Sequence, residues 1–365
     1  MPVKIKLPKI IINNRLLVIL SLITSLCILS ILLQISAGNG KFSTFAAPQL
    51  IKISIGLVIF LIIYSFKTSF IFSIVELLYF LCLLLVILVE ILGSVRLGAQ
   101  RWLQLGLLMV QPSEFMKIAV ILMLAKLLYK IPAGQEDKLK NYIIPFILSI
   151  IPSLLIIMQP DLGTASTIIV VTIAMFFIAQ LRLRYFIIAI IIALTAAPVM
   201  WFNLYSYQKD RILTFLNPDR DPLGSGYHMI QSKIAIGSGG FLGKGFLQGS
   251  QSQLNFVPEK QTDFIFALLT EEFGFLGALI LLSIYAILIF NCLIFALQAN
   301  NNFAKYSIIG LTFIFFTHIF FNIGMVIGIL PVVGIPLPLI SFGGTSIITT
   351  LASFALILNL SKKSS

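Results

Sequence analysis

Long apolar runs separated by short polar breaks make up most of the 365-residue chain. A helix needs about 20 apolar residues to cross the hydrocarbon core of a membrane, and about ten runs approach that length. They predict transmembrane helices near residues 16–36, 49–66, 70–92, 112–130, 142–158, 163–181, 185–203, 263–297, 304–330 and 338–360. We therefore expect an all-α polytopic membrane protein that forms a single domain over residues 1–365, with a long loop, residues 204–262, between the seventh and eighth spans.

The composition agrees with this pattern and excludes several other classes of protein. Hydrophobic residues make up 59% of the chain and charged residues 10%, whereas average soluble proteins carry about 25% charged residues. A soluble enzyme, a disordered chain and a nucleic-acid-binding domain are therefore excluded, despite the formal net charge of +12. The three cysteines lie far apart within apolar runs, so neither a disulfide framework nor a zinc site is predicted.

The basic residues predict the orientation of the chain. An even number of spans puts both termini on one side of the membrane. With cytoplasmic termini, the cytoplasmic segments hold fourteen of the 25 Lys and Arg residues. Six of the other eleven lie in loop 204–262, and long loops count little in the positive-inside rule. Without that loop, fourteen basic residues lie in cytoplasmic segments and five in outer segments. This excess indicates that both termini are cytoplasmic and that loop 204–262 is extracytoplasmic.

Three charged residues fall at the predicted outer ends of spans. Glu114 and Lys117 are three residues apart, on one face of the fourth span just after its Pro112 start signal. They could form a local ion pair that only neutralises two charges, or they could line a cavity. Asp161 lies in the short turn between the fifth and sixth spans, where a helix N-cap is its simplest role.

Asp263 closes loop 204–262, and aromatic and apolar residues follow it at once. Partial desolvation would raise the pKa of its carboxyl group and suit a general base, although a helix N-cap is again the alternative. The run 263–297 is longer than one crossing, so its polar start is expected to extend as helix outside the membrane or into a cavity.

The last outer turn carries an unusual number of helix breakers. Residues 331–346 read "PVVGIPLPLISFGGTS" and contain three prolines followed by Ser341, Gly343 and Gly344. Irregular backbone at membrane depth is tolerated only inside protein or along a wet cavity, so this run favours a cavity wall, with a tight turn as the simpler alternative. A phosphate loop is not present: the segment Ser238–Gly245 lacks the first glycine of that motif and the Ser or Thr after its lysine. No nucleotide is expected.

Five motifs resemble the SEDS family (shape, elongation, division and sporulation), and most of all its rod-shape-determining RodA branch rather than its division branch FtsW. They run in family order over residues 96–360, and long motifs of this kind are specific. They read "RLGAQRWLQLGLLMVQPSEFMKIAV", "QPDLGTAS", "DPLGSGYHMIQSKIAIGSGGFLGKGF", "PEKQTDFIFALLTEEFGFLG" and "ILPVVGIPLPLISFGGTS". One departure is Phe342, where the family frequently has tyrosine.

The resemblance implies ten transmembrane helices and a peptidoglycan glycosyltransferase. Such an enzyme polymerises lipid II on the outer face of the bacterial cytoplasmic (inner) membrane during cell elongation. It also implies that Asp263 is essential, and it carries the family's motif residues onto Glu114, Lys117 and Asp161. The implied partners are a class B penicillin-binding protein, which crosslinks the strands, and other membrane proteins of the elongation complex.

The residues themselves suggest how such a transfer could proceed. A diphosphate leaving group needs charge neutralisation more than protonation, so one base, Asp263, would be enough for a single displacement. The predicted substrate-binding set is Glu114, Lys117, Asp161, Arg101, Trp102, Lys233, Ser341, Gly343 and Gly344. A divalent cation, Mg²⁺ or Mn²⁺, could bridge the diphosphate to Asp161 or Asp263.

Two other function classes remain open at this point. A lipid II flippase or other transporter would also need many helices, but transporters usually show internal repeats and polar sites at the membrane midplane. A non-catalytic scaffold of the elongation machinery is the third possibility, and it would tolerate an isosteric change at Asp263.

Overall fold

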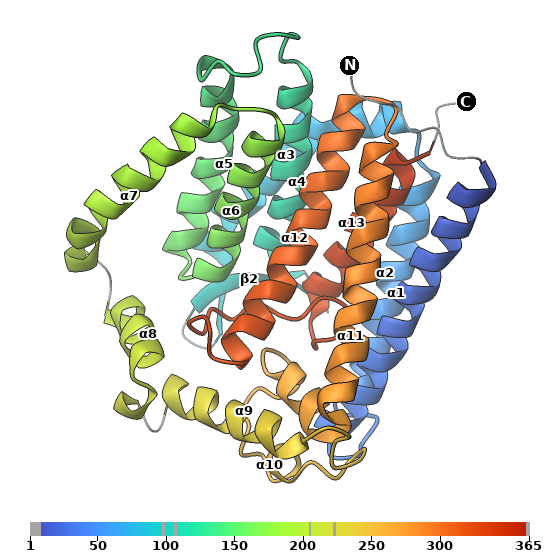
Figure 1. Ribbon diagram of the computed structural model, residues 1–365, viewed down its shortest axis with the longest axis vertical. Helices are drawn as coiled ribbons and strands as arrows, with labels where there is room; N and C mark the ends of the chain where they lie inside the picture. Colours follow the sequence, from blue (N-terminus) through green and yellow to red (C-terminus); the bar gives the residue numbers. More distant parts are fainter. Residues whose placement is uncertain (1–8, 97–98, 106–107, 204–205, 222–223, 363–365) are drawn as a thin grey trace.

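The computed structural model of the protein describes residues 9–96, 99–105, 108–203, 206–221 and 224–362 (Figure 1). Within these ranges lie the helices of 17 residues or more, which form a bundle except for the helix at Leu183–Asn203, which leans away from the others at the left of Figure 1. They are α1 (Lys9–Ala37), α2 (Ala46–Ser65), α3 (Thr68–Leu92), α4 (Pro112–Tyr129), α5 (Lys140–Met158), α6 (Leu162–Ile178), α7 (Leu183–Asn203), α11 (Ile265–Leu297), α12 (Asn302–Val326) and α13 (Gly344–Leu360).

The protein is a multi-span membrane protein, as predicted. Six described helices are long and apolar enough to cross a membrane, namely α1, α2, α3, α5, α11 and α12. Three further apolar helices are shorter, at Leu162–Ile178, Leu183–Pro198 and Gly344–Leu360, and α4 contains Glu114, Lys117 and Lys126 among its 18 residues. Each predicted span falls on one of these helices, while the number of ten membrane crossings stays a prediction.

The two ends of the bundle differ. Helix α1 begins and α13 ends toward the upper end of Figure 1, and the elements of loop 204–262 cross the lower end, which we call the loop end. These elements are α8 (Ser206–Leu216), a 3₁₀ helix (Pro218–Arg220), α9 (Ser225–Gly239) and α10 (Ser250–Gln253). The predicted long loop is therefore largely helical where it is described.

The segment between α3 and α4 adds a small sheet to the expected all-α fold. Strands β1 (Ser94–Arg96), β2 (Ala99–Leu105) and β3 (Leu108–Val110) pair antiparallel in the order β1-β2-β3. Ser94 faces Trp102 across one pair and Leu103 faces Val110 across the other. The Gln100 amide donates to the Val89 carbonyl oxygen at 3.0 Å, which fastens the sheet to the end of α3.

The last two predicted spans are shorter than expected at the loop end. Helix α12 stops at Val326 rather than residue 330, and α13 begins at Gly344 rather than residue 338. Residues 327–343, which we call the proline segment, contain neither helix nor strand. Pro331, Pro336 and Pro338 explain this, because proline lacks the N–H group that a helix interior needs.

Helix α11 is broken near the loop end, at Gly274 (φ 65°, ψ −163°). At 1.5 Å per residue its 33 residues would extend about 50 Å, well beyond the roughly 30 Å of hydrocarbon. The backbone of the glycine-rich segment 239–245 fills the break with four hydrogen bonds. They run from Lys244 N to Glu271 O (3.0 Å), from Gly245 N to Glu272 O (3.0 Å), from Phe275 N to Gly240 O (2.9 Å) and from Leu276 N to Phe241 O (3.1 Å).

We predict that Gly243→Ala destabilises the protein by about 1–3 kcal/mol, because a side chain at its φ of +83° is strained. A Cβ atom there would also overlap the Glu272 carbonyl oxygen in the break of α11. The measurement is thermal unfolding of the detergent-purified protein. Gly237→Ala is the matched control, because a Cβ atom at Gly237 meets nothing within 4 Å. Equal unfolding temperatures for the two variants would contradict the prediction.

Candidate functional site

The buried backbone of the proline segment is held by polar side chains from four helices. Ser30, Gln34, Gln49 and Asn322 are all 0% exposed, in the middle of apolar surroundings. The bonds are Ser30 Oγ to Ile340 O (2.9 Å), Gln34 Nε2 to Ile340 O (3.3 Å), Gln49 Nε2 to Ser341 O (3.0 Å), Tyr285 hydroxyl to Pro338 O (2.8 Å) and Asn322 Nδ2 to Ile335 O (2.8 Å). The segment is thus irregular backbone held inside the protein, and its role as a cavity wall stays a prediction.

Asp263 lies against this segment at the loop end. Its side chain is half-buried, and its Oδ2 atom is 3.5 Å from the position that a Cβ on Gly334 would take. Burial and the negative charge of Glu259 raise the pKa of the Asp263 carboxyl group to about 6, while the positive charges of Arg211 and Arg101 oppose the rise. This carboxylate can therefore accept a proton near neutral pH.

The geometry excludes the helix N-cap role for Asp263. Helix α11 starts at Ile265, its N-cap residue is Phe264, and no side-chain hydrogen bond caps it. Phe264 directly follows Asp263. The ring of His228 in α9 stacks on the Phe264 ring, with the two centroids 5.9 Å apart. The Asp263 side chain is partly buried in the structure, and burial is the largest cause of its raised pKa.

Asp161, by contrast, is a helix N-cap. Its Oδ1 accepts a hydrogen bond from the Thr164 N–H at 3.2 Å, at the start of α6, and its Oδ2 accepts one from the Gln111 amide at 2.9 Å. Both carboxylate oxygens already have partners. In the described part of the chain, no group of three or more His, Cys, Asp or Glu residues could hold a metal ion. These residues do not fit a resident metal centre.

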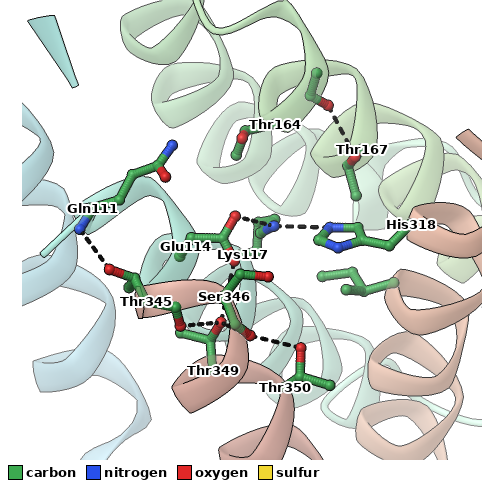
Figure 2. A network of polar contacts seen from close by, with 12 residues as sticks. Gln111, Glu114, Lys117, Thr164, Thr167, His318, Thr345, Ser346, Thr349 and Thr350 are labelled. Atoms are coloured by element: carbon green, nitrogen blue, oxygen red, sulfur yellow. Dashed lines mark hydrogen bonds and ion pairs between the residues drawn. The ribbon is translucent and has the colours of Figure 1, made fainter. Parts of the chain in front are cut away.

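Glu114 and Lys117 form a buried ion pair inside the bundle (Figure 2). The Lys117 ammonium donates to Glu114 Oε1 at 2.6 Å and to His318 Nε2 at 2.8 Å. Because an ammonium group has only donors, His318 accepts and carries its proton on Nδ1. The Thr349 hydroxyl donates to the other Glu114 oxygen at 3.1 Å. The pair therefore links α4 to α12 and α13.

A cavity of about 20 Å³ adjoins this ion pair, and Pro338 of the proline segment is among its lining residues. That volume has room for about one water molecule and none for a sugar ring. Glu114 and Lys117 are only 5% and 3% exposed. The structure supports the ion-pair interpretation of the spacing, and direct substrate contact by either residue stays a prediction.

Arg101 and Trp102 lie side by side in β2. The Arg101 guanidinium donates to the carbonyl oxygen of Gln159 at 3.1 Å and to that of Pro160, and so holds the turn before α6. Trp102 is half-buried, and its carbonyl oxygen accepts from the Ser94 hydroxyl at 3.3 Å. Arg101 therefore adds positive charge near Asp263 while its side chain fixes a neighbouring turn.

Two further predicted residues adjoin the proline segment or belong to it. Lys233 in α9 lies beside Gly328, at the first bend of the segment. The Ser341 hydroxyl donates to the Thr262 carbonyl oxygen at 2.6 Å and accepts from the Leu337 N–H at 2.8 Å. Ser341 is thus a structural link between the proline segment and the residue before Asp263.

Gly343 and Gly344 lie where the proline segment meets α13, as its N-cap and first residue. Lys52 of α2 lies close to Gly344, and its ammonium group is 3.4 Å from the centroid of the Phe342 ring. Lys52 was not among the residues predicted from the sequence. The contact also explains how phenylalanine serves at position 342, because a cation above a ring needs the aromatic face and no hydroxyl group.

Three uncharged residues of the site or of its support were also not predicted from the sequence. Gln111, Asn322 and Gln34 each donate to a residue of the site or of its support. In the sequence, these three residues are recognisable only as amide side chains within or next to an apolar run, where a polar group needs a hydrogen-bond partner.

Comparison with known proteins identifies the family. A family model described as "Cell cycle protein", for FtsW, RodA and SpoVE, matches residues 9–365. The chain belongs to this family. Among curated relatives, the peptidoglycan glycosyltransferase MrdB of Escherichia coli (strain K12) is 42% identical over 343 residues, which cover 92% of each chain.

Solved structures of family members share the fold. A chain from "Structural coordination of polymerization and crosslinking by a peptidoglycan synthase complex" is 31% identical with a TM-score of 0.82, over 94% of this chain and 96% of that one. The rod shape determining protein RodA of Thermus thermophilus is 25% identical with a TM-score of 0.71, over 94% of this chain and 95% of that one.

We predict that Lys117→Met lowers the stability of the protein by about 3–5 kcal/mol, because it leaves the buried Glu114 charge without its partner. Thermal unfolding in detergent measures this loss. The matched control is Arg182→Met, which removes the basic partner of the more exposed Arg182–Asp137 pair and should cost at most about 1 kcal/mol. Adding Glu114→Gln to Lys117→Met should restore part of the loss. Equal losses for the two single variants would contradict the prediction.

Proposed function

We propose that this protein is a peptidoglycan glycosyltransferase that polymerises lipid II, with Asp263 as its general base. The observation that carries the proposal is the Asp263 carboxyl group, half-buried, free of any capping role and with a pKa of about 6. A base works best when its pKa lies near the pH of the reaction. The name and 42% identity of the Escherichia coli relative support the same activity.

The proposed chemistry is a single displacement. A sugar hydroxyl of one lipid II molecule attacks the anomeric carbon of the other substrate, a new carbon–oxygen bond forms, and the bond to the diphosphate breaks. The hydroxyl proton passes to Asp263. Because the attacking oxygen enters opposite the leaving group, the configuration at the anomeric carbon inverts, and no second carboxyl group is needed as an acid.

We further propose that the diphosphate is neutralised at the loop end by basic side chains. Arg101 and Arg211 are close enough to Asp263 to influence its pKa, and Lys233 lies beside the proline segment. Any divalent cation would arrive with the diphosphate, because no group of three or more His, Cys, Asp or Glu residues in the described ranges could hold one alone. Mg²⁺ commonly binds in this way, through substrate phosphates and one or two carboxylates.

The loop end is proposed to face outward from the bacterial inner membrane, with both termini in the cytoplasm. The excess of Lys and Arg in the predicted cytoplasmic segments supports this orientation. We also propose a class B penicillin-binding protein as the partner, together with other membrane proteins of the elongation complex. A structural relative comes from a synthase complex that coordinates polymerisation with crosslinking, and crosslinking is the activity of such a partner.

We predict that Asp263→Ala lowers the rate of lipid II polymerisation about 10²–10⁴-fold, the usual contribution of a general base. The assay uses the purified protein with its partner, and an unchanged unfolding temperature shows that the variant is folded. Polymerisation by Asp263→Ala at the wild-type rate would refute the assignment. Lipid II translocation by both proteins in vesicles, without polymerisation, would instead indicate a flippase.

The pKa of Asp263 also predicts the pH dependence of the reaction. Below about pH 6 the carboxyl group is protonated and cannot accept the hydroxyl proton, so kcat/KM should fall about tenfold per pH unit as the pH drops. Above that pH the rate should level off. The measurement is kcat/KM for lipid II across this range. A profile that stays flat down to the ordinary carboxyl pKa of 3.8 would contradict the prediction.

A further inference from the structure

We propose that Asn322 is a positioning residue for Asp263, and that its amide clamps the backbone of Asp263 to the proline segment. Asn322 is completely buried in α12. Its Nδ2 group donates to the Asp263 carbonyl oxygen at 2.9 Å and to the Ile335 carbonyl oxygen at 2.8 Å. The proposal rests on the proposed role of Asp263 as the base, and it concerns a residue outside the predicted site.

The identity of the side chain at position 322 matters for this clamp. Both of its partners are carbonyl oxygens, which only accept hydrogen bonds, so the side chain must supply two N–H donors, as the uncharged NH₂ end of asparagine does. The Asn322 Oδ1 atom is buried without a partner among the described residues, and such a group is unfavourable for stability. A leucine of similar size would avoid that penalty but could hold neither carbonyl group.

The clamp is the last of three consecutive anchors on the backbone that leads into α11. The Gln261 carbonyl oxygen accepts from Phe342 N at 2.7 Å, the Thr262 carbonyl oxygen from Ser341 Oγ at 2.6 Å, and the Asp263 carbonyl oxygen from Asn322. The Asp263 carboxylate itself makes no hydrogen bond or ion pair with any residue in the described ranges. Its direction therefore depends on its backbone, and Asn322 is the anchor on Asp263 itself.

The helix that carries Asn322 is itself fixed on the same face. His318 lies four residues earlier, which puts it one turn away on the same side of α12, and it accepts the hydrogen bond from Lys117. One rigid helix therefore connects the buried ion pair to the backbone of Asp263. Holding a reacting group within a fraction of an ångström matters, because a displacement of about 1 Å can lower a rate about 10²-fold.

The test compares Asn322→Leu with a matched control, Asn359→Leu, in the full-length protein with its partner. Asn359 is also fully buried, also has an unpartnered Oδ1, and its Nδ2 donates to the carbonyl oxygens of Ile63, Tyr64 and Phe66 on α2 and just after it. Each variant thus loses a buried clamp on backbone carbonyl groups, but only one clamp holds Asp263.

We expect Asn322→Leu to lower kcat for lipid II polymerisation about 10–10²-fold, with KM for lipid II within about twofold of wild type. Asn359→Leu should keep kcat within about twofold while losing a similar amount of thermal stability. Asn322→Gln retains an NH₂ end and should recover part of the lost kcat. If Asn322→Leu fails to fold, Asn322→Ala, which also lacks a side-chain N–H donor, replaces it, and a lowered kcat at unchanged KM in that variant supports the proposal.

Several results would overturn the proposal. One is wild-type kcat in a folded Asn322→Leu or Asn322→Ala protein, neither of which has a side-chain N–H donor at position 322, and another is an equal loss of kcat in Asn322→Leu and Asn359→Leu. The Asp263→Ala variant shows whether the clamp alone is wrong or whether the proposed function is wrong as well. If Asp263→Ala is inactive while Asn322→Leu is fully active, only the clamp is wrong. If Asp263→Ala is fully active, the general base itself is wrong and the clamp has no catalytic purpose.

Discussion

Backbone N–H and C=O groups need partners wherever water is excluded, and residues 327–343 meet this requirement without helix or strand. Buried hydroxyl and amide side chains from α1, α2, α11 and α12 take the place of a hydrogen-bond ladder. The remaining parts of the site depend on this arrangement. The segment that they hold packs against Asp263, contributes Pro338 to the cavity beside the ion pair, and leads into α13.

The chemistry of Asp263 follows from how far this packing buries it. Burial alone disfavours the charged carboxylate and raises its pKa, and nearby Glu259 acts in the same direction, while Arg101 and Arg211 act against both. A fully apolar site would leave the group protonated at neutral pH and unable to accept a proton. A site with a close cationic partner would make it too weak a base. The half-buried position between these extremes gives a pKa of about 6.

The sequence was informative where one physical signal was strong. Runs of about 20 apolar residues predicted the long helices. The three-residue spacing of Glu114 and Lys117 placed them on one face of a helix, but the sequence left open whether they form an ion pair or line a cavity. The burial of both side chains in the structure favours the ion pair. The strands of 3–7 residues were not predicted, because they are much shorter than the apolar runs of about 20 residues from which the helices were predicted. The insertion of segment 239–245 into α11 depends on contacts between distant residues. Asn322 and Gln34 were not predicted, because the predicted site rested mainly on charged residues and amide side chains carry no charge.

The carboxylates near the proline segment and the break of α11 differ in their hydrogen-bond and ion-pair partners. This difference supports Asp263 as the general base. Glu114 is paired with Lys117, Asp161 caps α6, and Glu271 accepts from Lys244 and from the backbone that begins α10. Hydrogen bonds and cations that stabilise a carboxylate lower its affinity for a proton. The Asp263 carboxylate has no hydrogen-bond or ion-pair partner within the described ranges, and its anchors act on its backbone instead. A general base must keep its lone pairs free for the substrate hydroxyl, so rigidity has to come through the main chain, and the neighbours of Asp263 supply it there.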